Sequence, residues 1–216
     1  MVVLKINTYF VFQSSLEMNS ENYLKDISEI KSLMNKSSRF ISLSGLSGIM
    51  AGIYALIGAG YFYVSNKNNI IEIDKENLIP ITLTIIIVGL LSIITTIIIT
   101  SKRASITEQK AWSITTKNLV IAFSTTLIIG LVYIIFLLIQ DQYKQALALL
   151  LIFYGLALVH ASKHTNNIVK PLGIIEISLG LICALFPKYS FWFWVLGFGI
   201  VHVIYGAIIY FKYDKK

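Results

Sequence analysis

Apolar residues gather along this chain in six long runs separated by short polar segments. A helix needs about 20 mostly apolar residues to cross the hydrocarbon core of a bilayer. The pattern therefore predicts an all-α membrane bundle of six transmembrane helices. The predicted spans are about 40–64, 78–100, 118–139, 145–162, 171–187 and 189–211, of which the fifth is short and bounded by prolines.

Composition and charge support this interpretation. Of the 216 residues 56% are hydrophobic and 13% are charged, which excludes a soluble globular domain and a disordered chain. With six spans, 14 of the 18 Lys and Arg lie on the side that holds both termini. Cytoplasmic loops carry this excess, so we expect both termini in the cytoplasm. The net charge of +7 is then a signal of topology, and a nucleic-acid partner is not expected.

The region before the first span divides into two parts. Apolar residues at 4-3-4 spacing predict a cytoplasmic amphipathic helix over 18–39, and they are Tyr23, Ile27, Ile30 and Met34. This helix would dock a partner protein or a second copy of the chain, or would lie on the membrane. Residues 1–17 are expected to be a poorly ordered upstream extension, with Met18 as the natural start. Residues 40–211 would then form the six-helix domain and 212–216 a cytoplasmic tail.

Two ionisable residues lie deep inside predicted spans. An ionisable residue within the membrane is costly, and it is a functional-site hypothesis by default. Glu176 in the fifth span is the one acid of this kind, and His202 in the sixth is its counterpart in the same half of the membrane. Together, with His160 at the end of the fourth span as a third member, they would bind a proton, a cation or a cofactor. The alternative is a structural hydrogen bond between the two spans.

Glycines recur at helical spacing in the same spans. We expect Gly45, Gly48, Gly52, Gly173, Gly180, Gly199 and Gly206 to let helices approach closely. The first span would use its glycines as a dimer seam or for packing inside the bundle. The single cysteine, Cys183, rules out an intramolecular disulfide and is interpreted as a small packing residue.

The sequence contains few residues in patterns typical of metal, cofactor or catalytic sites. His160 and His164 have the i, i+4 spacing of metal ligands, but no glutamate accompanies them as in a zincin helix. Paired histidines for haem would need His160 and His202 at one depth on facing helices. No Walker loop, Gly-x-Ser-x-Gly or Cys-x-x-Cys motif is present. We therefore predict no metal, no cofactor and no enzymatic activity.

Several strings resemble one family. They are Tyr23-Leu24-Lys25-Asp26-Ile27, Ser37-Ser38-Arg39-Phe40-Ile41-Ser42-Leu43-Ser44-Gly45-Leu46, Tyr154-Gly155-Leu156-Ala157 and Gly197-Phe198-Gly199-Ile200-Val201-His202-Val203-Ile204-Tyr205-Gly206. From residue 18 onward the chain resembles an uncharacterised family of small six-span membrane proteins from Bacteroidetes-type bacteria. The resemblance implies a bacterial inner (plasma) membrane location and no known activity. It also implies that Glu176 and His202 are better site candidates than His160 and His164.

Three functions follow as expectations. The first is a non-enzymatic binding or regulatory membrane protein, whose partners are the lipid bilayer and either a cytoplasmic protein or a second copy of itself. The second is a small proton- or cation-coupled transporter or channel that uses Glu176 and His202. The third is a haem-binding membrane protein.

Overall fold

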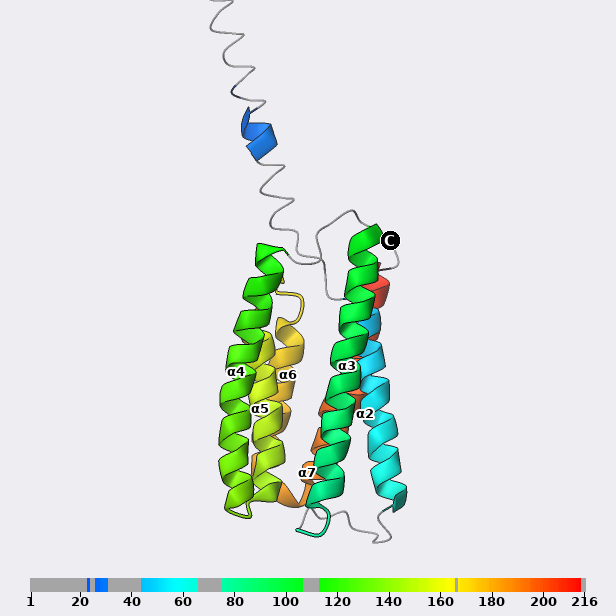
Figure 1. The fold of residues 1–216 in the computed structure, drawn as a ribbon, viewed down its shortest axis with the longest axis vertical. Helices are drawn as coiled ribbons and strands as arrows, with labels where there is room; N and C mark the ends of the chain where they lie inside the picture. The colour runs from blue at the N-terminus through cyan, green and yellow to red at the C-terminus, as the bar shows by residue number, and fades with distance from the viewer. Residues whose placement is uncertain are drawn as a thin grey trace, which may run out of the picture. The chain divides into compact units, whose positions relative to one another are not determined.

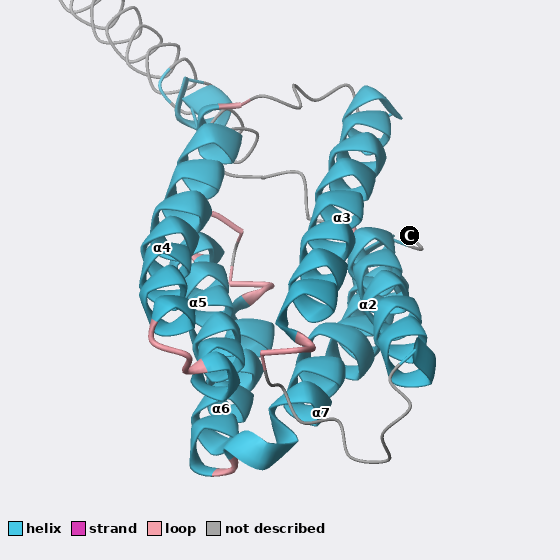
Figure 2. Cartoon of the chain, turned by 60° about the horizontal axis from the view of Figure 1, so that its bottom comes forward, coloured by secondary structure: helices cyan, strands magenta, loops and turns pink. Residues whose placement is uncertain are grey.

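A computed structural model describes residues 23, 26–30, 44–65, 75–106, 113–165 and 167–214 of the chain. It divides into two units, Met1–Arg39 and Phe40–Lys216. The described residues form helices joined by turns, with no strand among them (Figure 2). The all-helical architecture expected from the apolar runs is thus confirmed for this part of the chain.

Five single helices are followed by one helix that is built from several consecutive segments. The five are α2 (Gly45–Ser65), α3 (Leu78–Ile106), α4 (Ile114–Ile139), α5 (Tyr143–Ser162) and α6 (Lys170–Leu185). A 3₁₀ turn, η1 (Pro187–Tyr189), leads into α7 (Ser190–Trp194), the π-helical η2 (Val195–Val201), α8 (His202–Ile209) and the π-helical η3 (Tyr210–Asp214). These last four segments follow one another without a break and are called the C-terminal helix below.

Five of these elements are long and apolar enough to cross a membrane, and not six. They are Gly45–Ser65, Leu78–Lys102, Ile114–Ile139, Tyr143–Ser162 and Pro187–Lys212. The exception is α6, which has 16 residues. At 1.5 Å per residue it is about 24 Å long, shorter than the roughly 30 Å hydrocarbon core. Prolines bound α6 at both ends, because Pro171 lies in its first turn and Pro187 follows its C-terminal end.

Within the unit Phe40–Lys216, the C-terminal helix joins two groups of helices. One group pairs α2 with α3, and the other packs α5 against α4 and α6 (Figure 1). The C-terminal helix contacts α2 along η2 and α8, and it contacts α5 and α6 through α7 and η2. In this way α3 and α4 lie at the outside, and the C-terminal helix lies between α2 and the α5–α6 pair.

The outer helices expose broad apolar surfaces. Large hydrophobic side chains are exposed along α3 and α4; among them are Ile79, Leu83, Ile87, Leu90, Ile94, Ile121, Ile128, Val132, Ile135 and Ile139. Soluble monomers rarely expose contiguous apolar areas of this kind. Hydrocarbon covers such faces in a bilayer, so they are compatible with an integral membrane protein.

The described contacts define two ends of the bundle. At one end the start of α2 meets the end of the C-terminal helix, where Gly45 lies against the backbone of Tyr210. At this end the Tyr205 hydroxyl also donates to the carbonyl of Ile168, in the turn between α5 and α6. At the other end Phe62 of α2 and Phe191 of α7 pack with their rings tilted and the ring centroids 5.5 Å apart.

The aromatic cluster that opens the C-terminal helix is divided between core and surface. A belt of rings at the membrane interface is the expected role of such a cluster. Tyr189 and Trp192 are exposed, whereas Phe191 and Trp194 are each 2% exposed and belong to the core. The helical period decides this, because residues three apart share a face and this face packs on α2 and α5.

Most of the predicted N-terminal helix lies outside the described residues. Tyr23 and residues 26–30 are helical, and Tyr23, Ile27 and Ile30 are 60%, 60% and 55% exposed. Met34, the extension 1–17 and residues 215–216 of the tail lie outside the described residues.

Candidate functional site

The centre of the site is Glu176, on the face of α6 that packs into the bundle. Its side chain is 0% exposed. Gly173, Gly180 and Cys183 lie three residues before it and four and seven after it, and all three are buried. The spacing therefore placed these residues on one face of a helix, and the structure turns that face inward.

His202 of the C-terminal helix lies beside Glu176. The ring atom Nδ1 is 3.3 Å from Glu176 Oε1, and both side chains are buried. The same Nδ1 is 2.8 Å from the carbonyl oxygen of Gly197, one turn earlier in the π-helical η2. A carbonyl can only accept, so Nδ1 carries a hydrogen and donates it to Gly197.

Glu176 is left without a hydrogen bond despite this short distance. Neither Oε1 nor Oε2 has a hydrogen-bond partner, because the His202 N–H points at Gly197 instead. The carboxyl packs against the backbone of Gly197, where a Cβ would lie 2.6 Å from Glu176 Oε2. A glycine at position 197 therefore makes room for the carboxyl between α6 and the C-terminal helix.

Tyr154 of α5 completes the cluster. Its hydroxyl is 2.8 Å from His202 Nε2. In a neutral ring with its hydrogen on Nδ1, Nε2 accepts and the Tyr154 hydroxyl donates. Phe198 stacks on the His202 ring at 5.7 Å and 15°. The imidazole is thus fixed on both nitrogens and on one face.

Sequence reasoning did not assign a role to Tyr154 or Gly197. Both lie in the strings that carry the family resemblance. A tyrosine in an apolar run gives no indication of which residue on another helix it will contact. Contacts between α5 and the C-terminal helix bring Tyr154 and His202 together across 48 positions.

His160 does not join this cluster. Its side chain is exposed, and its Nδ1 lies 3.0 Å from Thr126 Oγ1 of α4. The helix α5 ends at Ser162, so His164 follows in a turn and does not continue the same helical face. The i, i+4 geometry that a metal pair would need is therefore not formed. Among the described residues, no group of three or more His, Cys, Asp and Glu side chains is placed to share a metal ion.

The arrangement around His202 does not fit a haem iron. An axial histidine needs a free ring nitrogen. Both nitrogens of His202 are engaged, one by the Gly197 carbonyl and the other by the Tyr154 hydroxyl.

The glycines form two close antiparallel helix contacts on either side of the cluster. In the first, α2 meets the C-terminal helix: a Cβ on Gly52 would lie 2.7 Å from the carbonyl of Gly199, and one on Gly48 would lie 3.2 Å from Gly206 Cα. In the second, α5 meets α6: a Cβ on Gly155 would lie 2.6 Å from the carbonyl of Gly173.

The residues that these glycines contact show which helices they bring together. Gly180 meets the carbonyl of Ala148 on α5, at 2.9 Å from an added Cβ, and Gly45 meets Tyr210 and Gly206. The glycine face of α2 is therefore covered by the C-terminal helix of the same chain, which leaves it no room to serve as a dimer seam.

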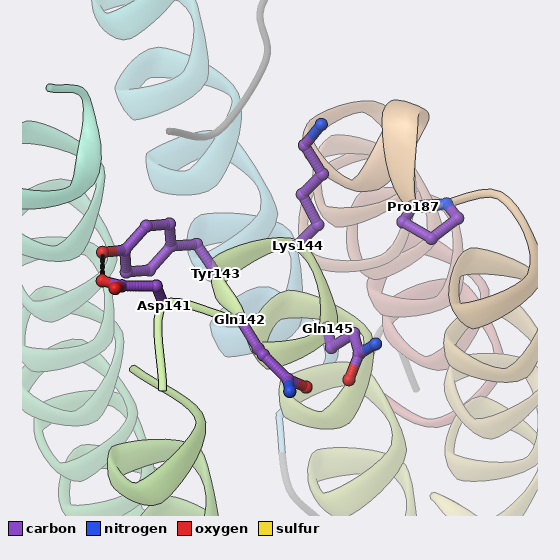
Figure 3. Close-up of a pocket in the computed structure, with 6 residues that line it drawn as sticks. All are labelled: Asp141, Gln142, Tyr143, Lys144, Gln145 and Pro187. Atoms are coloured by element: carbon purple, nitrogen blue, oxygen red, sulfur yellow. Dashed lines mark hydrogen bonds between the residues drawn. The ribbon is translucent and has the colours of Figure 1, made fainter. Parts of the chain in front are cut away.

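A pocket of about 230 Å³ lies elsewhere, at the turn between α4 and α5. Figure 3 shows its lining residues, which are Asp141, Gln142, Tyr143, Lys144, Gln145 and Pro187. The Tyr143 hydroxyl donates to Asp141, whose φ of 60° marks the tight turn. None of the Glu176 cluster lines this pocket.

No family model, curated protein or solved structure matches the chain.

Proposed function

We propose that this is a non-enzymatic binding or regulatory protein of the bacterial inner membrane, with six spans and both termini in the cytoplasm. The short α6 is the additional span. It runs antiparallel to α5 over its length, as the pairs Gly155–Gly173 and Ala148–Gly180 indicate. Hydrophobic mismatch of a short helix is offset by local thinning of the bilayer or by its packed neighbours.

The bundle contacts support this topology. The start of α2, the α5–α6 turn and the end of the C-terminal helix share one end, through Gly45–Tyr210 and Tyr205–Ile168. Among the described residues, the segments at this end carry more lysines and arginines than those at the opposite end. The positive-inside rule then assigns that end to the cytoplasm. Cysteine accessibility at Lys102→Cys, expected inside, and Lys188→Cys, expected outside, tests it in a Cys183→Ala background. Labelling of both from the same side would contradict the proposal.

The observation that carries the regulatory function is the exposed apolar face of Tyr23, Ile27 and Ile30, on an otherwise polar helical segment. We assign this face to the anionic lipid surface. Lysines and arginine near the first span add attraction to anionic headgroups, about 1 kcal/mol each. The helix would then report lipid composition to the bundle.

Limited trypsin digestion of the protein in nanodiscs tests this assignment. Cleavage after Lys25 and Lys31 should be slowed in anionic lipid and rapid in zwitterionic lipid. Deleting residues 2–17 is the matched control and should leave this difference unchanged. Equal cleavage in both lipids would contradict lipid docking.

A second candidate is a proton- or cation-coupled transporter. The observation that favours it is a fully buried carboxyl without a hydrogen bond, 3.3 Å from a histidine. Buried ionisable groups of this kind mark proton and ion pathways. Proton flux into liposomes should be abolished by Glu176→Gln and retained by Asp141→Asn, which alters an exposed turn carboxylate. Absence of flux in the unmodified protein would overturn the candidate.

A further inference from the structure

The cluster of Glu176, His202 and Tyr154 admits two protonation states that are neutral overall. In the first, Glu176 is a carboxylic acid and His202 is a neutral imidazole. In the second, Glu176 is a carboxylate and His202 an imidazolium. Both carry the same number of protons, so the balance between them does not depend on pH.

The hydrogen bonds of His202 favour the first state. In an ion pair, the Nδ1–H would donate to the carboxylate, since a charge-assisted bond is about twice as strong as a neutral one. Instead this N–H donates to the Gly197 carbonyl at 2.8 Å, although Glu176 Oε1 is only 3.3 Å away. A carboxylate at this distance would accept the Nδ1–H in preference to the Gly197 carbonyl.

The surroundings of Glu176 lead to the same state. A buried carboxylate without a partner costs far more than a neutral carboxylic acid. Both oxygens of Glu176 lack a partner, and the side chain is 0% exposed. Among the described residues, the other titratable groups packed around it are the Tyr154 hydroxyl and His202, with Cys183 two turns along α6. None supplies a positive charge while His202 is neutral.

We propose that Glu176 is a proton-binding site inside the bundle, occupied in the arrangement described, with neutral His202 as its gate. Release of the proton from the Glu176 carboxyl to solvent water leaves a carboxylate at Oε1. The Nδ1–H of His202 then turns from Gly197 to this carboxylate. Tyr154 holds the ring at Nε2 throughout and is a positioning residue. The one covalent bond broken is the O–H bond of the Glu176 carboxyl, and the hydrogen bond from His202 Nδ1 to Gly197 is exchanged for one to Glu176.

The inference concerns the site of the transport candidate but does not require flux. A proton site could equally bias the conformation of the C-terminal helix, whose π-helical segment includes the Gly197 acceptor. Widened helical turns of this kind occur frequently at functional sites. Protonation is measured below without transport, so the failure of one proposal is distinguishable from the failure of the other.

Infrared spectroscopy of the protein in nanodiscs tests the proposal. At neutral pH the unmodified protein should show the C=O stretch of a carboxylic acid without a hydrogen bond. The band should disappear in Glu176→Gln and persist in Asp141→Asn. A spectrum without this band, or a band unchanged by Glu176→Gln, would overturn the proposal.

A second variant separates the acid from the ion pair. His202→Phe should retain the carboxylic acid band, because the acid does not depend on a charged histidine. An ion pair predicts the reverse, with no band in the unmodified protein and a new one in His202→Phe. Nitrogen-15 NMR of histidine-labelled unmodified protein requires no variant. It should show His202 neutral with hydrogen on Nδ1, and an imidazolium signal would contradict the assignment.

Discussion

The outer helices α3 and α4 differ from the inner helix α5 in how apolar they are and in how much of their surface is buried. The two outer spans are the most apolar of the five candidates, yet only 11% of the residues in their apolar 18-residue stretches are buried, against 50% for that of α5. In a soluble protein the most apolar helix would be the most buried. Here lipid is the solvent of the outer faces, and the inner helices use small and polar residues to pack on one another. Apolarity thus indicates the periphery of this bundle, while small and polar residues such as Gly173, Glu176 and His202 lie at its centre.

The largest effect is expected where the inner helices touch. A Cβ on Gly206 would lie 2.5 Å from the backbone nitrogen of Ile49, and backbone cannot move aside as a flexible side chain does. Gly206→Leu should lower stability by about 3 kcal/mol or more by forcing α2 and the C-terminal helix apart. Thermal unfolding in detergent, followed by size-exclusion chromatography, measures it. Gly89→Leu on α3 is the control, since nothing lies within 4 Å of a Cβ there. Equal losses would contradict the close contact.

Two isoleucines of α3 test the comparison within a single helix. Ile81 is 4% exposed and packs in the core, whereas Ile87 is 55% exposed. Ile81→Ala should cost about 2–3 kcal/mol by leaving a cavity. Ile87→Ala should change stability by less than about 0.5 kcal/mol, because lipid tails replace the lost contacts. Unfolding of both variants in nanodiscs gives the two values, and similar losses would mean that α3 is covered by protein on both faces.

The polar cluster should behave unlike the rest of the centre. Glu176 buries two oxygens without partners, so it is not expected to stabilise the fold. Glu176→Met, which replaces the carboxyl by an apolar group of similar length, should raise stability by about 1 kcal/mol. Thermal unfolding at neutral pH measures the change. A loss of stability instead would show that Glu176 serves as structural glue between α6 and the C-terminal helix.

An effect as small as that of Glu176→Met, but of opposite sign, is expected at Tyr154. Tyr154→Phe removes the donor to His202 Nε2 and should cost about 1 kcal/mol. Tyr133→Phe on α4 is the matched control, because Tyr133 is 50% exposed and should lose nothing measurable. Beyond stability, Tyr154→Phe should broaden the nitrogen-15 signal of His202, since the ring loses its anchor. An unchanged signal would remove Tyr154 from the site.

The sequence predicts the positions of the helices well, but it does not predict which residues meet in the site. Uninterrupted apolar runs located every described span to within a few residues, because length and apolarity are local properties. They overestimated α6, which ends at Leu185 and is too short to count by length alone. They do not distinguish aromatic rings at a membrane interface from rings in the core, where Phe191 and Trp194 lie. A hydropathy pattern shows that a helix is in the membrane but not which helix covers which face.

The amino-acid sequence by itself determined that this is a helical chain suited to lipid, and that its buried chemistry is confined to a few ionisable residues. Only the tertiary structure decided that His202 lies beside Glu176 while His160 pairs with Thr126. It also decided that the His202 N–H faces Gly197 and leaves the carboxyl without a partner. The physical reason is that helix periodicity fixes which residues share a face, whereas partners across helices depend on the rotation and depth at which glycine contacts allow those helices to meet.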